Sequence, residues 1–418
     1  MSDIKELRED EICPCGSGGK YGSCCKKKGF RYVIDETNIS KEIPMNQEIQ
    51  DILKEQEQLF IEYYGRQPRS DEFVFSFMPV YNDEILLKTI HMFRQLGIDE
   101  RKIYVYYKSD GLIPCDLNVN LLSQKELQEY EALCKEFDER MNSQLNAHMD
   151  VLPYVLLSNA HINEQIDYSI DAFINCFNDF LRRHSGMTSI RDYAMVTEVD
   201  YCMFSALKTI KVLQSLRELL KLQIPECIYA LGRGIFENYM YLCAINKEPK
   251  LFQERLLPKL DGENYKFDVS SDGKINYRKV ISRKTGVSVN VEPSNKELKK
   301  YLPNKTDSEL YDLFYRTACQ YVHVDIMSAK SYFAVTDPYD EIDPSLIAGL
   351  IILVITSFLV VQIAKNSNVE ELFQKDANYL CEKLNSRFQE CLEMVKCDPE
   401  HSNIIFDLLL HRLEQEGK

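Results

Sequence analysis

Leu346 to Ala364 reads LIAGLIILVITSFLVVQIA, nineteen residues without a charged side chain. A helix of this length can just span a bilayer, or it can be the central helix of a bundle that covers it on all sides. The polar residues Thr356, Ser357 and Gln362 and the lack of tryptophan speak against insertion in a membrane. We therefore expect a buried helix, with membrane association through 346–364 as the alternative.

The apolar stretch is accompanied by amphipathic patterns, in which apolar residues recur every three or four positions. These patterns cover residues 156–184, 200–222, 226–246, 306–324 and 368–396. Thr306 and Glu309 form a capping box at the start of the fourth pattern. Residues 265–280 alternate instead around a Ser-Asp-Gly turn, which is typical of a β-hairpin. We predict that residues 151–418 form a helical bundle with a β-hairpin insertion.

The preceding region mixes strand and helix patterns. Phe73–Val80 and Lys102–Lys108 are rich in aromatic or β-branched residues and predict strands, with a helical pattern at 84–96 between them. A Ser-x-x-Glu capping box at 123–126 predicts a helix that runs through Met141. The expected fold is mainly α, and its predicted parts are an N-terminal zinc module at 1–30, a small α/β region at 31–150 that opens on a linker at 31–45, and the bundle at 151–418.

Composition limits the classes of function. The chain has 418 residues and a net charge of -15, which opposes a broad nucleic-acid surface but leaves room for a local basic patch. Ten of its fourteen cysteines are scattered singly, mostly among apolar residues, which is typical of a reducing compartment. The charged opening of the chain does not resemble a signal peptide. We expect a cytoplasmic protein.

The other four cysteines, Cys13, Cys15, Cys24 and Cys25, lie within thirteen residues. Thiolate sulfur is the preferred ligand of structural zinc, and four thiolates close a tetrahedral shell. The alternatives are a disulfide knot, which needs an oxidising compartment, or four unrelated thiols. A segment this short cannot bury a core, so we expect Zn²⁺ to supply its folding energy.

The segment CPCGSGGKYGSCC resembles the SEC-C motif, a small zinc-binding module known from the bacterial protein-translocation ATPase. Gly19 and Gly22 stand where that motif carries basic residues. The resemblance covers about the first thirty residues. It implies a module that docks to protein partners or ribosomes and carries no catalysis.

Residues 195–365 resemble a bacterial domain of unknown function that often accompanies SEC-C motifs. The resemblance rests on Arg233-Gly234-Ile235-Phe236-Glu237-Asn238 in one predicted helix and on Tyr321-Val322-His323 in another. It implies no established activity.

Arg316 and His323 lie seven residues apart, so a continuous helix would place both on one face, about 10 Å apart along its axis. The spacing is similar to the R-x4-6-H pattern of HEPN helical bundles, many of which are metal-independent ribonucleases that pair two copies. The resemblance implies that His323 is a general acid or base, that Arg316 binds the phosphate, and that the chain forms a homodimer. Thr317 departs from the more polar residue that the family prefers. The alternative is that His323 bonds within the bundle and Arg316 pairs with Asp312.

Arg233 and Glu237 are four residues apart on an otherwise apolar helix. They favour a structural ion pair, and the functional alternative is that they orient His323 in a shared cleft.

Residues 277–305 hold eight lysines and arginines against two glutamates. This basic interval either follows an RNA backbone or is a solvated surface.

These patterns lead to three hypotheses, of which the third is a membrane-tethered sensor that depends on residues 346–364. The first is a helical effector targeted by its zinc motif, with His323, Arg316, Glu237 and Arg233 at a ribonuclease site that acts in defence or toxicity. The second is a non-enzymatic adaptor that binds a protein or a ribosome through the zinc motif.

Overall fold

The computed structural model describes residues 5–34, 39–42, 47–68, 82–109, 111–114, 118–119, 122–143, 151–185, 195–323, 325–333, 336–397 and 404–416. The chain divides into two compact units, Met1–Asp150 and Val151–Lys418. Within the described residues helices dominate, and the predicted mainly α fold is confirmed.

The first unit begins with a small antiparallel sheet in the order β1 (Lys5–Glu6), β2 (Arg31–Ile34) and β3 (Ile39–Glu42). The linker predicted at 31–45 is therefore wrong for its described residues, because Arg31–Ile34 pairs with both of its neighbours. The sheet and the cysteine segment share a core whose buried members are Leu7, Cys13, Cys15, Tyr21, Cys25, Phe30 and Tyr32.

The rest of the first unit is helical where it is described. Its helices are α1 (Gln47–Tyr64), α2 (Asn82–Gln95), α3 (Glu100–Lys108) and α4 (Gln124–Met141). The helix expected at 84–96 and the capping box of Ser123 and Glu126 are confirmed. The strand expected at 73–80 lies outside the described residues.

The strand predicted at Lys102–Lys108 is wrong, because these residues belong to α3. Asp99 caps this helix by accepting a hydrogen bond from the backbone of Arg101. The β-branched and aromatic residues are accommodated by tertiary contacts: Tyr104 packs on Phe137 of α4 and donates a hydrogen bond of 2.6 Å to Glu136.

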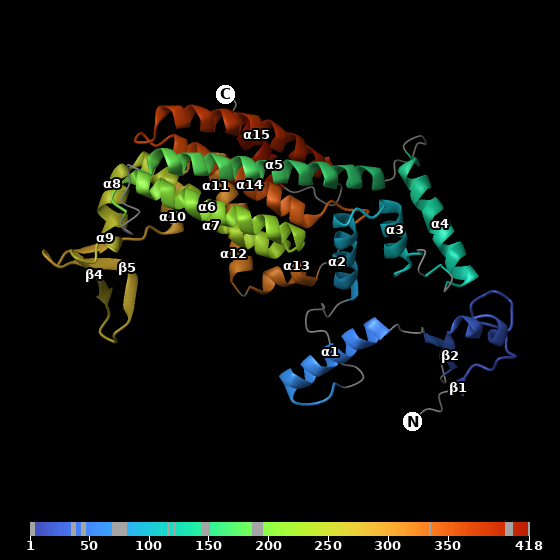
Figure 1. Ribbon diagram of the computed structural model, residues 1–418. Coiled ribbons are helices and arrows are strands. Elements are labelled where there is room, and N and C mark those ends of the chain that lie inside the picture. The colour runs from blue at the N-terminus through green and yellow to red at the C-terminus, as the bar shows by residue number, and fades with distance from the viewer. Residues whose placement is uncertain are drawn as a thin grey trace. The chain divides into compact units, whose positions relative to one another are not determined.

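The second unit is built around α14 (Pro344–Ala364), and long helices run beside it (Figure 1). These are α5 (Leu152–His184), α6 (Glu198–Lys221), α7 (Pro225–Lys247) and α15 (Glu371–Cys397), followed by α16 (Ile404–Glu416). Every residue of α14 from Ser345 onward is buried. The described part holds one helix long and apolar enough to cross a membrane, and it is this fully covered one. The expected buried helix is confirmed.

Two polar side chains in the middle of α14, Thr356 and Ser357, are paired. Thr356 donates a hydrogen bond of 2.8 Å to the carbonyl of Ile352, one turn back in the same helix. Ser357 donates at 2.8 Å to the side chain of Asn385 on α15. Since a buried hydroxyl without a partner costs free energy, these bonds let polar residues lie at the centre of the bundle.

An irregular segment follows α7. It comprises α8 (Pro249–Leu251), a π-helical turn (Phe252–Leu256), α9 (Leu257–Leu260), β4 (Tyr265–Val269), β5 (Ile275–Ser282), β6 (Ser288–Asn290) and α10 (Asn295–Leu298). The predicted hairpin is confirmed as β4 and β5, which turn at Gly273 with φ of +81°. The third strand, β6, pairs antiparallel with β5 and was not expected.

The helix predicted at 306–324 is divided into α11 (Lys305–Leu310), a π-helical turn (Tyr311–Tyr315) and α12 (Arg316–Val322). The predicted capping box is wrong in position. Asn304 is the cap, and its side chain accepts a hydrogen bond of 2.8 Å from the backbone of Asp307. The short α13 (Ala329–Phe333) follows α12.

Candidate functional site

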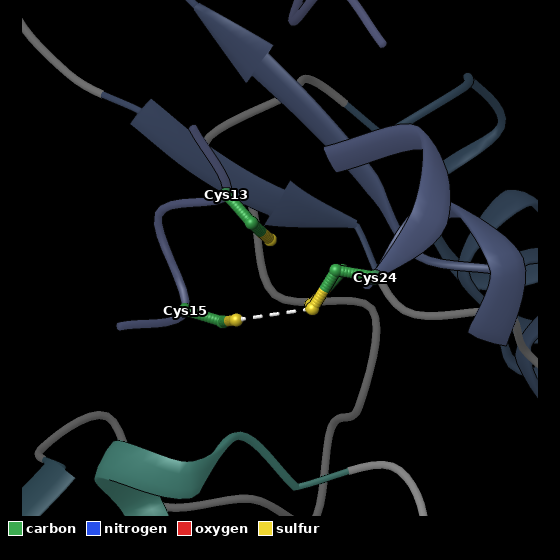
Figure 2. A group of neighbouring side chains, drawn as sticks. Cys13, Cys15 and Cys24 are labelled. Carbon is green, nitrogen blue, oxygen red and sulfur yellow. Dashed lines mark hydrogen bonds between the residues drawn. The ribbon is translucent and has the colours of Figure 1, made fainter. Parts of the chain in front are cut away.

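The four N-terminal cysteines converge on one point. Their sulfur atoms all lie within 4.8 Å of one another, and only Cys24 is partly exposed. An antiparallel bridge between Ile12 and Lys20 folds the first pair back toward the second. Figure 2 shows the sulfurs of Cys15 and Cys24 facing each other, 3.5 Å apart, with that of Cys13 turned toward the same space.

This geometry fits a metal ion. Four sulfurs at a zinc–sulfur distance of about 2.3 Å form a tetrahedron with edges of about 3.8 Å. The observed sulfur positions are close to such a shell. With four protein ligands no position remains for water or substrate, so the cluster suits a structural ion and not a catalytic one.

Neighbouring groups act differently on the thiols of Cys15 and Cys25. Burial opposes ionisation of Cys15, but the hydroxyl of Ser17, 3.2 Å from its sulfur, and the other nearby donors outweigh burial and lower its pKa to about 6. Burial and the sulfurs of Cys13 and Cys15 raise the pKa of Cys25 to about 12. A bound cation favours the thiolate form of all four cysteines. Its positive charge offsets the repulsion between the sulfurs, which together with burial raises the pKa of Cys25.

Glycines shape the loop around the cluster. Gly16 and Gly18 have φ of +82° and +71°, in the left-handed region that side chains rarely adopt. At Gly22, a Cβ atom would lie 2.8 Å from Cβ of Glu9. This close approach gives a physical reason for glycine at a position where the resembling motif carries a basic residue.

In the second unit, a polar cluster joins α7 to the π-helical turn. Arg233 and Glu237, 23% and 27% exposed, form an ion pair of 3.1 Å. The hydroxyl of Tyr315 donates a hydrogen bond of 2.7 Å to Glu237, and Asn295 donates to the Tyr315 oxygen. The Arg233 guanidinium also lies over the Tyr315 ring, 5.9 Å from its centre. Burial and the Glu237 carboxylate hold the pKa of Tyr315 well above its usual range.

Asn238 lies next to this cluster and is buried. The ammonium of Lys208, on α6, is 3.5 Å from its side-chain oxygen. Its side-chain nitrogen has no hydrogen-bond partner within the described residues. Sequence patterns did not indicate Tyr315, Asn295 or Lys208 as members of a site, because they come from three separate elements that only the tertiary fold brings together.

Arg316 and His323 are both exposed. His323 was expected inside the helix. It is instead the C-terminal cap residue of α12, and its backbone is extended. Its amide still donates to the carbonyl of Cys319, so its Cα remains on the helical path. The proposed pairing of Arg316 with Asp312 is not observed, since Asp312 accepts a hydrogen bond of 2.5 Å from Lys299.

Of the four residues expected at one site, the described contacts join Arg233 and Glu237 and leave Arg316 and His323 apart from them and from each other. Arg233 and Glu237 bond to each other and to Tyr315, the residue directly before Arg316. Within the described part of the chain, no hydrogen bond or ion pair joins His323 to Arg233, Glu237 or Arg316. The polar cluster is therefore adjacent to Arg316 in sequence, while His323 lies at the far end of α12.

Residues 199–342 match a family of unknown function (DUF5677), about a third of the chain. The match begins in α6, ends just before α14, and includes the polar cluster, Arg316 and His323. The expected resemblance to a domain of unknown function is thus confirmed, and it assigns no activity. No protein of known annotation and no solved structure matches the chain.

Proposed function

We propose that the second unit cleaves RNA without a metal, as HEPN-like ribonucleases do, and that His323 and Arg316 are its catalytic residues. The supporting observation is that both side chains are exposed and lack a hydrogen bond or ion pair within the described residues. Seven residues of helix place their Cα atoms about 10 Å apart with an angular offset of about 20°. A phosphodiester fits between an imidazole and a guanidinium at that separation.

The reaction requires two proton transfers. One proton leaves the attacking 2'-hydroxyl, and one is added to the departing 5'-oxygen. The neutral imidazole of His323 accepts the proton of the 2'-hydroxyl, whose oxygen then bonds to phosphorus. The bond from phosphorus to the 5'-oxygen breaks, and that oxygen takes a proton from the imidazolium or from water. Arg316 donates hydrogen bonds to the phosphate oxygens as their negative charge develops. The products are a 2',3'-cyclic phosphate and a 5'-hydroxyl.

The test compares substitutions at the proposed site with substitutions of the same residue types on other helices. We expect His323→Ala and Arg316→Ala to lower the rate of RNA cleavage by about 10²–10⁴-fold. The matched controls are His411→Ala and Arg182→Ala, which remove an exposed histidine and an exposed arginine from other helices. Equal activity of all four variants would contradict the proposal, provided that their thermal unfolding is unchanged.

We also propose that the ion held by the cysteine cluster is Zn²⁺ and that the cluster is a SEC-C module. Four thiolates with no open position suit this soft, tetrahedral ion. Elemental analysis of the purified full chain should find about one zinc per chain, and replacement of Cys13 and Cys15 by serine should remove it. A chain that retains its zinc without these thiols would contradict the assignment.

The alternative function is that of an adaptor without enzymatic activity. It is favoured by the four-cysteine ligand set, because a site without an open position cannot activate water or substrate, so the module is suited to folding and binding. Beside the cluster, the Lys26–Lys28 turn presents three consecutive lysines. If the module docks to ribosomes, the full chain should sediment with them, and Lys27→Glu should weaken this more than Lys54→Glu, a change in α1. Sedimentation without any RNA cleavage would favour the adaptor.

A further inference from the structure

The helix that carries Arg316 is interrupted directly before that residue. Tyr311–Tyr315 forms a π-helical turn between α11 and α12. A single π-helical turn holds one residue more than an α-helical turn, so it rotates every following side chain by about 100° around the helix axis. The direction in which Arg316 leaves the helix is therefore set by this turn. Such turns are rare and occur frequently at functional sites.

Tyr315, the last residue of the turn, is held by two other elements. Its side chain is 3% exposed, and its hydroxyl donates a hydrogen bond of 2.7 Å to Glu237 of α7. The same oxygen accepts a hydrogen bond from the side chain of Asn295 in α10. The hydroxyl thus uses its proton toward α7 and its oxygen toward α10.

The acceptor of the Tyr315 hydroxyl is itself fixed in place. Oε1 of Glu237 accepts a second hydrogen bond, of 3.1 Å, from Nε of Arg233. Because the acceptor is a carboxylate, the bond from Tyr315 belongs to the stronger, charge-assisted kind. The Arg233 guanidinium covers the Tyr315 ring as well. We call Arg233, Glu237, Asn295 and Tyr315 the clamp.

The first residue of the turn is packed against the last. Tyr311 stacks on Tyr315 with 5.0 Å between the ring centres, and the ammonium of Lys299 lies 5.3 Å from the Tyr311 ring centre. Burial raises the pKa of Tyr311, and the cations of Lys299 and Arg316 oppose this rise. Arg316 therefore lies within electrostatic range of the turn that precedes it.

We propose that the clamp positions Arg316 by fixing the π-helical turn, so that Tyr315 and Glu237 are positioning residues of the ribonuclease site. The inference rests on the proposed function, in which Arg316 binds the phosphate. A guanidinium stabilises the transition state only where its charge develops, so a small displacement lowers kcat more than it raises KM. For this role Arg233 and Glu237 need no contact with His323.

The experiment removes one hydroxyl group. Tyr315→Phe keeps the buried ring and deletes the bond to Glu237. The matched control, Tyr301→Phe, deletes a hydroxyl that donates at 2.6 Å to Glu248, outside the clamp. RNA cleavage is measured for both changes in the full chain, and again in a full chain that also carries Arg316→Ala. Amide hydrogen exchange of the π-helical turn and α12 is measured on the same proteins.

We expect Tyr315→Phe to lower kcat about tenfold or more with little change in KM, and Tyr301→Phe to leave kcat unchanged. Once Arg316 is replaced by alanine, Tyr315→Phe should have no further effect, because it acts through that residue. Glu237→Gln keeps an acceptor oxygen and should retain more activity than Glu237→Ala. The absence of any loss, or an equal loss with and without Arg316, would overturn the proposal.

Hydrogen exchange separates this result from failure of the ribonuclease proposal. Without the charge-assisted bond, amides of the turn and α12 should exchange at least about tenfold faster in Tyr315→Phe than in Tyr301→Phe. If Arg316→Ala cleaves RNA as fast as the unchanged chain, the ribonuclease proposal fails, and exchange alone decides whether the clamp fixes the turn. Equal exchange in the two tyrosine variants would overturn the clamp in either case.

Discussion

At Gly232, α7 approaches α14 more closely than a side chain would allow. A Cβ atom there would lie 2.9 Å from side-chain atoms of both Ile352 and Phe314. We expect Gly232→Ala to lower the free energy of unfolding by about 1–3 kcal/mol, because the overpacking outweighs the gain in helix propensity. Denaturant unfolding of the full chain measures this.

Gly234, two residues further along the same helix, is the matched control for that change. The nearest atoms to a Cβ atom there belong to the flexible end of Lys208, at 3.8 Å, which is an ordinary contact. Gly234→Ala should therefore be neutral or stabilising by up to about 1 kcal/mol. Equal effects at the two glycines would show that the close approach of α7 and α14 does not matter.

At the scale of elements, α16 is held by a buried ion pair. Arg412, 4% exposed, donates a hydrogen bond of 2.9 Å to the fully buried carboxylate of Asp307 in α11. Its guanidinium also lies 4.7 Å from the centre of the Phe358 ring in α14. We expect Arg412→Ala to destabilise the unit by about 3–5 kcal/mol, because it removes the guanidinium that pairs with a buried carboxylate.

The double variant Arg412→Met, Asp307→Leu tests the origin of that loss, since replacing both partners leaves no buried charge. It should recover a large part of the stability in denaturant unfolding. If the double variant is less stable than Arg412→Ala, the loss comes from packing of α16 and not from the lost charge partner of Asp307.

The cysteine segment is the element that we expect to depend most on a bound metal ion for its folding. Its core consists of a few side chains, among which three of the four cysteines are buried. We expect a metal chelator to unfold residues 5–34 and 39–42 while the helices of the second unit persist, because the two units have separate cores. Amide hydrogen exchange should lose its protection in the first segment alone. A loss of protection in both units would contradict this independence.

At the scale of the whole molecule, buried thiols and phenols make stability depend on alkaline pH. Burial raises the pKa of Cys202 and of Cys391 to about 12, and it raises the pKa of Tyr229 as well. The folded state therefore retains protons that the unfolded state loses from about pH 9 upward. Stability is full below that pH and falls by up to about 1.4 kcal/mol per pH unit for each group as pH rises toward 12.

Denaturant unfolding at pH 8, 9, 10 and 11 measures this slope. Cys202→Ala removes one of the titrating groups and should make the decline shallower by one proton, whereas Cys227→Ala removes an exposed thiol and should leave it unchanged. A flat profile up to pH 11 would show that these groups titrate alike in both states.

The sequence by itself determined the features that rest on local chemistry. The uncharged run of α14 favoured a helix covered on all sides over a membrane span, the spacing of Cys13 to Cys25 predicted four thiols at one point, and the Ser123 capping box placed the start of α4. Each of these depends on residues close in the chain, so its physical cause is contained in a short window.

Tertiary structure decided what depends on distant partners. Lys102–Lys108 has strand-forming residues, yet the Asp99 cap and burial against α4 make it a helix. Glu237 bonds to Tyr315 across 78 residues, and the end of α12 leaves His323 in solvent at the helix terminus. Burial and contact between separate elements fix these positions, because the free energy of a long-range contact appears only once the whole bundle has assembled.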